Sequence, residues 1–174
     1  FDHIFMDDKT NELVVQTFIQ ECYKSDEGLP AKSIFFCASQ RHAKHMKKVF
    51  DVLIPHLGND VQVITSDMHR AEDEVHRFKN SSEPRIALSV GMLDTGIDVP
   101  EVCNLVFVKP VYSGIRFWQM FGRGTRNQAS CKHPEWLPDR EKKDFLLLDF
   151  DIGGHSNLEA HKIPASNESQ QMDV

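Results

Sequence analysis

The amino-acid sequence predicts an α/β fold in three layers, with a mostly parallel β-sheet flanked by helices on both faces. Two observations favour this class, and the chain length favours a single domain. Short apolar runs alternate along the chain with segments of helical periodicity, which is the pattern of a parallel sheet with crossover helices. The apolar runs are continuous, as in strands that are covered on both faces. The 174 residues suffice for one domain with a substantial core.

Each element follows from its local pattern. The predicted strands are residues 33–38, 61–65, 85–90, 104–108 and 145–150. The predicted helices are one around residues 12–22, one that Ser39 caps and that carries Ala43, Met46, Val49, Phe50 and Leu53, one with the apolar face Ala71, Val75 and Phe78, and one from Ser113 through Phe117 and Phe121.

The domain is expected to span residues 1–150, followed by a polar tail or linker at residues 151–174. The tail contains Gly153-Gly154 with many Ser, Asn and Gln, and it lacks periodicity. The net charge of −6 resides in the ends, because residues 1–30 carry two lysines against seven acidic residues and residues 151–174 carry one against four. Residues 31–150 therefore carry a net charge of +2, which permits contact with a nucleic-acid backbone but not strong binding by charge alone.

The sequence favours a cytoplasmic protein that contacts no membrane. No apolar run approaches the ~18 residues of a membrane-spanning helix, and no signal-peptide pattern opens the sequence. The cysteines, Cys22, Cys37, Cys103 and Cys131, are widely spaced and are expected to be reduced. Because the sequence begins at Phe1, we expect it to be part of a longer chain.

Two polar clusters follow predicted strands. Arg123 and Arg126 are three residues apart, so a helical turn would point both to the same side, and Gly122 leaves room beside them. Two permanently charged guanidiniums suit a triphosphate. Upstream, the Asp98 carboxylate is suited to accept hydrogen bonds from ribose hydroxyls, and Gly96 allows a tight loop. Each cluster alone also fits a solvated turn, but ligands of such sheets gather at strand carboxyl ends, so both are expected to face one crevice.

Together these segments resemble motifs IV, V and VI of superfamily 2 helicases. The matching segments are residues 32–39, 89–98 and 119–126, which span nearly all of residues 31–126. The segments Gly96-Ile97-Asp98-Val99-Pro100-Glu101-Val102 and Gln119-Met120-Phe121-Gly122-Arg123-Gly124-Thr125-Arg126 are most similar to the restriction (R) subunit of type I restriction enzymes. The resemblance implies a RecA-like fold and the second motor domain of an ATP-dependent DNA translocase.

The resemblance also implies a role for each matching residue. Arg126 would be the arginine finger on the γ-phosphate of ATP, with Arg123 as its companion. The nucleotide site would also include Gln119, Gly96, Gly122 and Asp98, the last on the ribose. The phosphates of the nucleic acid would be contacted by Ser39, Thr65 and Ser89.

The expected partners follow from what the sequence lacks. It contains no Gly-x-x-x-x-Gly-Lys-Ser/Thr segment, the loop that cradles nucleotide phosphates. ATP with Mg²⁺ would therefore be bound mainly by the first RecA-like domain of the same full-length chain, and this chain alone is expected to be inactive. The other partners that the resemblance implies are double-stranded DNA and the methylation and specificity subunits of a type I complex.

Other functions remain open at this stage. Motifs V and VI also occur in DNA-repair and RNA helicases. Asp139, Glu141 and Lys143 imitate a metal-dependent nuclease motif, although the two acids are too close in sequence to come from separate strands, so a charged loop is expected. A non-catalytic interaction domain is the third alternative.

No metal site is expected. The segment Asp73-Glu74-Val75-His76 spells a DExH box, but no apolar strand precedes it, so it is expected to be a solvated helix. The pair His42 and His45 and the pair Cys131 and His133 offer too few ligands, and these histidines are expected to be exposed.

Overall fold

The computed structural model describes residues 5–93, 98–109, 128–150 and 158–164. A six-stranded sheet has the order β2-β3-β1-β4-β5-β6. Its parallel strands are β1 (Ser33–Phe36), β2 (Val61–Thr65), β3 (Ile86–Val90), β4 (Asn104–Phe107) and β5 (Asp144–Phe150). Strand β6 (Leu158–Pro164) pairs antiparallel with β5. The predicted α/β class with a mostly parallel sheet is confirmed.

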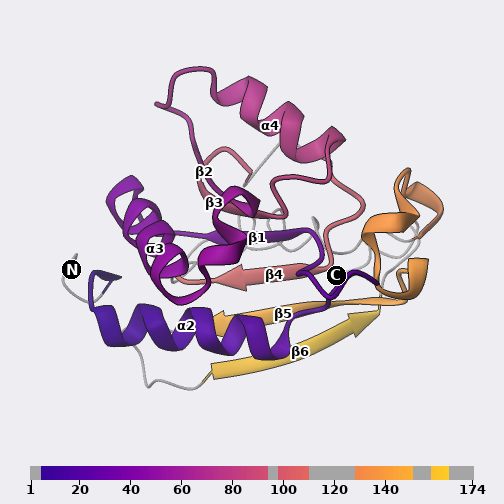
Figure 1. Ribbon diagram of the computed structural model, residues 1–174, viewed down its shortest axis with the longest axis horizontal. Coiled ribbons are helices and arrows are strands. Elements are labelled where there is room, and N and C mark those ends of the chain that lie inside the picture. The colour runs from indigo at the N-terminus through magenta and orange to yellow at the C-terminus, as the bar shows by residue number, and fades with distance from the viewer. Residues whose placement is uncertain (1–4, 94–97, 110–127, 151–157, 165–174) are drawn as a thin grey trace, which may run out of the picture.

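Helices cover both faces of this sheet (Figure 1). Helices α2 (Asp8–Glu21) and α3 (Gln40–Leu53) pack on one face, where the ring of Phe35 lies 4.8 Å from that of Phe18 and 5.5 Å from that of Phe50. Helix α4 (Ala71–Asn80) packs on the other face with Phe36 of β1. Because successive strand residues point to opposite faces and both faces are covered, all four residues of β1 are buried. No helix among the described residues is long and apolar enough to cross a membrane.

The helix starts are set by capping side chains. The Ser39 hydroxyl accepts a hydrogen bond from the His42 backbone N–H at 3.1 Å, which confirms the predicted cap of α3. Helix α2 begins earlier than expected, because the Asp7 carboxylate accepts from the Thr10 N–H at 2.8 Å. The helix predicted from Ser113 lies outside the described residues.

Short 3-10 helices occupy the connections, namely η1 (Pro55–Asp60), η2 (Gln128–Ser130), η3 (Pro134–Trp136) and η4 (Pro138–Arg140). The last three lie between the predicted arginine cluster and β5, at the right of Figure 1. They therefore connect the candidate nucleotide site to the sheet.

A buried lysine joins the start of β1 to the end of α4. The Lys32 ammonium donates to the carbonyl oxygens of Phe78, Ser81 and Pro84 at 2.7, 2.7 and 2.6 Å. Burial lowers the pKa of Lys32 to about 7, yet three carbonyl acceptors require the three N–H donors that only the protonated amine supplies. The charge also lies at the negative end of the α4 dipole, which favours it.

The irregular tail expected at residues 151–174 is wrong for its middle part. Residues 158–164 form β6 and pair along the whole of β5. The apolar side chain of Ile163 packs against the core, and the Lys162 ammonium lies 5.4 Å from the Tyr23 ring centroid. This strand exists because β5 offers an open edge, a long-range condition that local composition does not report. The division of the chain at residue 150 stays a prediction.

Candidate nucleotide and nucleic-acid site

The carboxyl edge of the parallel sheet brings three predicted site residues together. Thr65 ends β2 beside Val90 of β3, and Ser89 lies beside Phe36 of β1. Ser39 follows β1 and begins α3. The three predicted nucleic-acid contacts therefore lie on adjacent strands, or directly after one, at a single edge.

Ser39 belongs to a loop that a buried hydrogen-bond chain fixes. The Ala38 N–H donates to His42 Nδ1 at 3.1 Å. His42 Nε2 lies 3.2 Å from Asn11 Oδ1, and the Asn11 amide donates to the Phe5 carbonyl at 2.8 Å. Because Nδ1 accepts, Nε2 must carry the proton and His42 must be neutral.

The environment of His42 enforces that neutral state. The side chain is fully buried, and this burial, with a smaller contribution from His45, lowers the pKa of His42 to about 4. The expectation that His42 is exposed was wrong, because the polar residues around it in sequence lie on another side of α3. Its neighbour His45 is half-buried, and its Nε2 lies 2.9 Å from the Asp8 carboxylate.

The three hydroxyls of this edge differ in accessibility. Ser89 is fully buried, and its hydroxyl accepts from the Leu93 N–H at 3.2 Å, which directs the chain out of β3. Thr65 is also buried. Ser39 is partly exposed, and accepting from His42 leaves its O–H free to donate to a ligand. Ser39 is therefore the hydroxyl of the three best placed for an external phosphate.

The Asp98 loop is tied to the segment that precedes β5. The buried Lys142 ammonium donates to the Pro100 carbonyl at 2.7 Å, and Cys131 Sγ lies 3.5 Å from the same oxygen. Burial lowers the pKa of Lys142, while the carboxylates of Glu101 and Asp98 oppose that shift. Asp98 is partly exposed, and the residues that follow it, Pro100 and Glu101, are held in place by these contacts.

Glu101 makes the second connection between these segments. It is almost fully buried, and its Oε1 accepts from the backbone N–H groups of Lys132 at 2.7 Å and His133 at 3.1 Å. Hydrogen bonds from two N–H groups to one carboxylate are charge-assisted and strong. Residues 98–101 and 131–142 are thus joined by buried side-chain hydrogen bonds.

The other predicted nucleotide contacts, Gly96, Gln119, Gly122, Arg123 and Arg126, lie outside the described residues. Their roles stay predictions. The described structure reaches them from two sides, at Asp98 and at η2.

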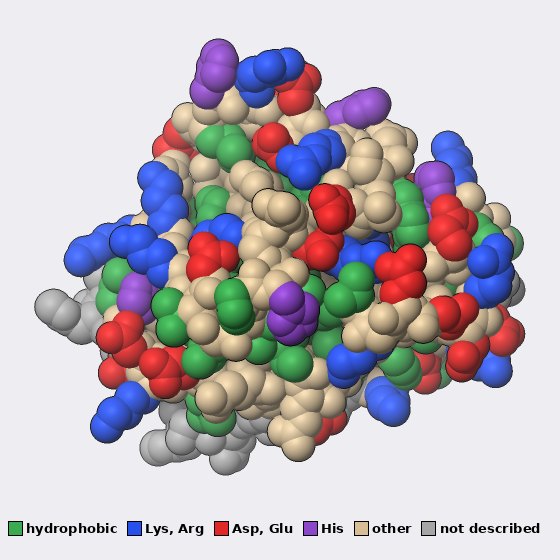
Figure 2. Space-filling view, in the orientation of Figure 1, with side chains coloured by type: hydrophobic (Ala, Val, Ile, Leu, Met, Phe, Trp, Pro, Cys, Tyr) green, Lys and Arg blue, Asp and Glu red, His purple; other side chains and the backbone are tan. Residues whose placement is uncertain are grey.

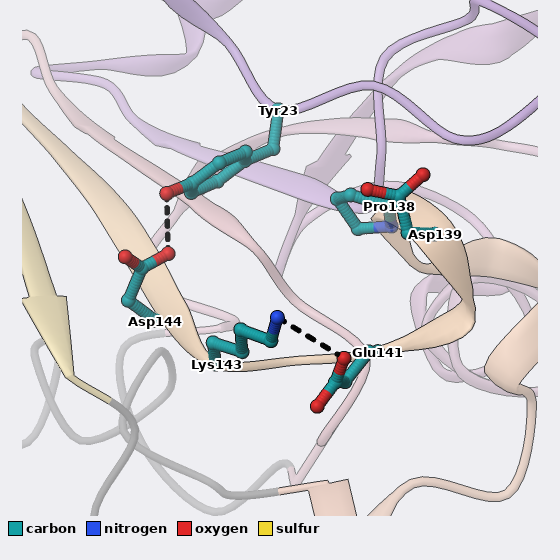
Figure 3. A pocket seen from close by; sticks show the side chains of 6 residues that line it. All are labelled: Tyr23, Pro138, Asp139, Glu141, Lys143 and Asp144. Atoms are coloured by element: carbon teal, nitrogen blue, oxygen red, sulfur yellow. Dashed lines mark hydrogen bonds and ion pairs between the residues drawn. The ribbon is translucent and has the colours of Figure 1, made fainter.

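The nuclease alternative gains no support from the geometry of its residues. Asp139, Glu141 and Lys143 border a small pocket of about 190 Å³, but Figure 3 shows the Asp139 carboxylate pointing away from the other two. Lys143 pairs with Glu141 at 3.3 Å. The neighbouring Asp144 carboxylate accepts a hydrogen bond from the Tyr23 hydroxyl. The acids do not converge on a shared point where a metal ion would bind.

The other segments that resemble functional motifs have structural roles. Asp73 and Glu74 lie in the first turn of α4, as the sequence predicted, where acidic side chains favour the helix dipole. His133 stacks on Trp136 with ring centroids 3.8 Å apart and is partly buried rather than exposed. Among the described residues, no three His, Cys, Asp or Glu side chains group closely enough to hold a metal ion.

Sequence reasoning missed His42, Asn11, Glu101 and Lys142 as residues that shape the site. Each acts on a partner at least 31 positions away, or through a chain that includes one, so no local spacing reports it. The one available signal for Glu101 was its place in the matching segment Gly96–Val102, and for His42 it was its position three residues after a helix cap.

Comparison with known sequences supports the resemblance to helicases. Residues 12–128 match the helicase conserved C-terminal domain family. The chain is 34% identical over 138 residues to the endonuclease subunit of the type I restriction enzyme EcoKI of Escherichia coli strain K12, a match that covers 74% of this chain. It is 32% identical over 133 residues to the corresponding EcoAI subunit of Escherichia coli, which covers 72% of this chain. The chain spans only 11% and 16% of the lengths of these two relatives.

A solved structure agrees with the sequence relatives. A fragment assigned to the HsdR subunit of a type I restriction enzyme from Vibrio vulnificus YJ016 superposes with a TM-score of 0.64 at 26% identity, covering 87% of this chain and 28% of that one. Because the family model matches residues 12–128, the chain belongs to the helicase conserved C-terminal domain family, and its mostly parallel sheet between helical layers is a RecA-like fold.

Proposed function

We propose that this domain is the second motor domain of an ATP-dependent DNA translocase, in the restriction subunit of a type I restriction enzyme. It would supply half of an ATP site and part of the DNA track. The supporting likenesses are those to the EcoKI and EcoAI endonuclease subunits. The methylation and specificity subunits of such an enzyme would then be its partners.

The main support for the ATP-site part of the proposal is the contact between the segment after Asp98 and the segment after Arg126. Cys131 touches Pro100, two residues beyond Asp98. Arg126 precedes Cys131 by five residues, a separation that spans at most about 17 Å of extended chain. Covalent connectivity thus keeps the proposed ribose acceptor and the proposed arginine finger in the same region.

In this proposal each residue has a defined task. Arg126, with Arg123 beside it, donates hydrogen bonds to the γ-phosphate and stabilises the charge that develops there during hydrolysis. Asp98 accepts from the ribose hydroxyls, Gln119 helps to link the site to the first RecA-like domain, and Gly96 and Gly122 leave room for the surrounding loops. The first RecA-like domain holds Mg²⁺ and most of the triphosphate, since no phosphate-binding loop is present in this sequence.

On the DNA side, the proposal assigns a direct phosphate contact to Ser39, at the sheet edge that it shares with Thr65 and Ser89. Ser39 donates directly through its free O–H. The buried Thr65 and Ser89 hold the edge in shape. Such contacts position the backbone without reading its sequence.

The test is Arg126→Ala in the intact protein, with Arg77→Ala on the exposed side of α4 as the matched control. Loss of an arginine finger is expected to lower the turnover number for ATP by about 10³ to 10⁵, with DNA affinity within about twofold because no phosphate of DNA is contacted there. The control should keep full turnover. Near-normal ATPase activity in Arg126→Ala would contradict the proposal.

A further inference from the structure

The chain contains one strongly basic stretch whose charged side chains have no role in the proposed site. Residues 31–50 hold five Lys or Arg residues and no Asp or Glu, although the whole chain has a net charge of −6. Most of this stretch is α3. In Figure 2, Lys and Arg side chains gather over α3 at the left of the molecule. Such a local excess of positive charge in an acidic chain indicates a binding surface for anions.

Three of these side chains form a continuous surface, here called the α3 basic face. Arg41, Lys44 and Lys48 are exposed, and their spacing of three and four residues places them on one side of the helix. Met46 and Phe50 mark the opposite, buried side.

The α3 basic face borders a hollow of about 560 Å³. Its rim also includes Met6, Gln40 and His45. The hollow is large enough to admit phosphate groups rather than a single ion. The surface is therefore concave as well as positively charged.

The cations of this face are available to a ligand, unlike their neighbours. Lys47 is neutralised by Asp51, at 2.8 Å between Nζ and Oδ1, and His45 faces Asp8. Within the described ranges, the three side chains of the α3 basic face form no ion pair.

We propose that the α3 basic face binds consecutive phosphates of a nucleic-acid duplex, extending the track beyond the sheet edge. The face begins two residues after Ser39, the partly exposed hydroxyl of that edge. From Arg41 to Lys48 the helix rises about 10 Å. One strand of duplex DNA advances about 3.4 Å per phosphate along the duplex axis, so a span of this length carries about three to four phosphates, enough for each of the three cations to contact one.

The choice of nucleic acid over an acidic protein follows from this continuity with Ser39, and it rests on the proposed function. The face supplies charge, which the near-neutral sheet edge lacks. It would therefore add affinity and salt dependence, without base specificity. Removing this positive charge should lower the affinity for DNA without changing the maximal rate of ATP hydrolysis.

The test compares two triple variants of the intact protein. One is Arg41→Gln, Lys44→Gln and Lys48→Gln. The matched control is Arg77→Gln, Lys79→Gln and Lys143→Gln, which removes the same charge at exposed positions on α4 and just before β5, away from α3. Glutamine has a helix propensity close to those of lysine and arginine, so both variants should fold.

The first measurement is the salt dependence of binding to a random-sequence DNA duplex. Each lost phosphate contact lowers the slope of log affinity against log salt by about 0.9. The α3 variant should therefore lose about 2 to 3 in slope, while the control keeps the slope of the parent protein. Equal slopes in the two variants would overturn the inference, as would unchanged DNA binding together with lost binding of an acidic protein.

The second measurement separates this inference from the proposed function. In DNA-stimulated ATP hydrolysis, the α3 variant should need about tenfold more DNA for half-maximal stimulation and reach a normal maximal rate. Arg126→Ala should instead fail at every DNA concentration. A lowered maximal rate in the α3 variant at saturating DNA would contradict its assignment as a purely DNA-binding surface. Normal turnover in Arg126→Ala would remove the ATP-site proposal while leaving the salt-slope result to stand on its own.

Discussion

The buried His42 predicts a specific dependence of stability on pH. Its Nδ1 accepts from the Ala38 N–H, so a second proton would place two N–H groups against each other. An unfolded chain takes up this proton near pH 6.5, whereas burial lowers the pKa of the folded His42 to about 4. Between these values the unfolded state binds more protons, so stability rises with pH through this window.

The magnitude follows from the same two values. At about 1.4 kcal/mol per pH unit, the separation from 6.5 to about 4 contributes about 3 kcal/mol. This stabilisation is fully present above about pH 6.5 and is lost as the pH falls to about 4. The Ala38–Ser39 loop that His42 fixes should loosen over the same interval.

The assay is urea unfolding of the parent chain and of His42→Gln at a series of pH values. Glutamine can replace one of the two hydrogen bonds but does not titrate, so the variant should be less stable by about 1 to 2 kcal/mol at pH 7. This deficit should shrink and then reverse as the pH approaches about 4. Acidic groups titrate in both proteins, so their effect cancels in the difference. A deficit that stays constant, within about 0.5 kcal/mol, from pH 7 to pH 4 would refute the reasoning.

Two further substitutions test the scaffold of the site and the core. Glu101→Ala removes the acceptor of the Lys132 and His133 N–H groups and should lower the free energy of unfolding in urea by about 3 kcal/mol. Glu101→Gln keeps an acceptor oxygen and should lower it by only about 1 kcal/mol. Equal losses in the two variants would mean that these hydrogen bonds contribute little. Phe35→Ala removes a fully buried ring that packs between two others and should lower the free energy of unfolding by about 3 to 5 kcal/mol. The control Leu13→Ala, at a residue that is 60% exposed, should lower it by about 0.5 kcal/mol or less. A comparable loss in the two variants would contradict the assignment of Phe35 to the core.

The sequence predicted those parts of the fold that depend on local patterns. Strand β2 has the predicted bounds, and Ser39 caps α3 as expected. The parts that failed depend on distant partners. His42 looked exposed because α3 is polar around it, but its buried side meets Asn11 of α2. Residues 158–164 looked irregular because their strand exists only beside β5.

The candidate site likewise has features that depend on local sequence and contacts that depend on distant partners. Residue types and spacing indicated which side chains suit phosphate and ribose, since that information is local. They could not indicate that the Asp98 loop is held by Glu101 and Lys142 against the segment before β5. These contacts join segments from opposite sides of the predicted arginine cluster. Only the folded arrangement of the chain reveals them.

The geometry also bears on how a movement on the DNA side of this domain would be transmitted through the sheet. The Cys37 N–H donates to the Ser89 carbonyl at 2.9 Å, which links the strand before Ser39 to β3. The Ser89 hydroxyl in turn fixes Leu93, at the start of the connection that carries Asp98. A displacement of the chain before Ser39 would therefore be transmitted to β3 and, through the Ser89 hydroxyl, to Leu93. Because strand pairs in a packed core resist gradual deformation, such a link should transmit a shift of β3 as a unit rather than absorb it. Ser89 is therefore better explained as the link between β1 and the turn at Leu93 than as a phosphate ligand, and its complete burial supports that role.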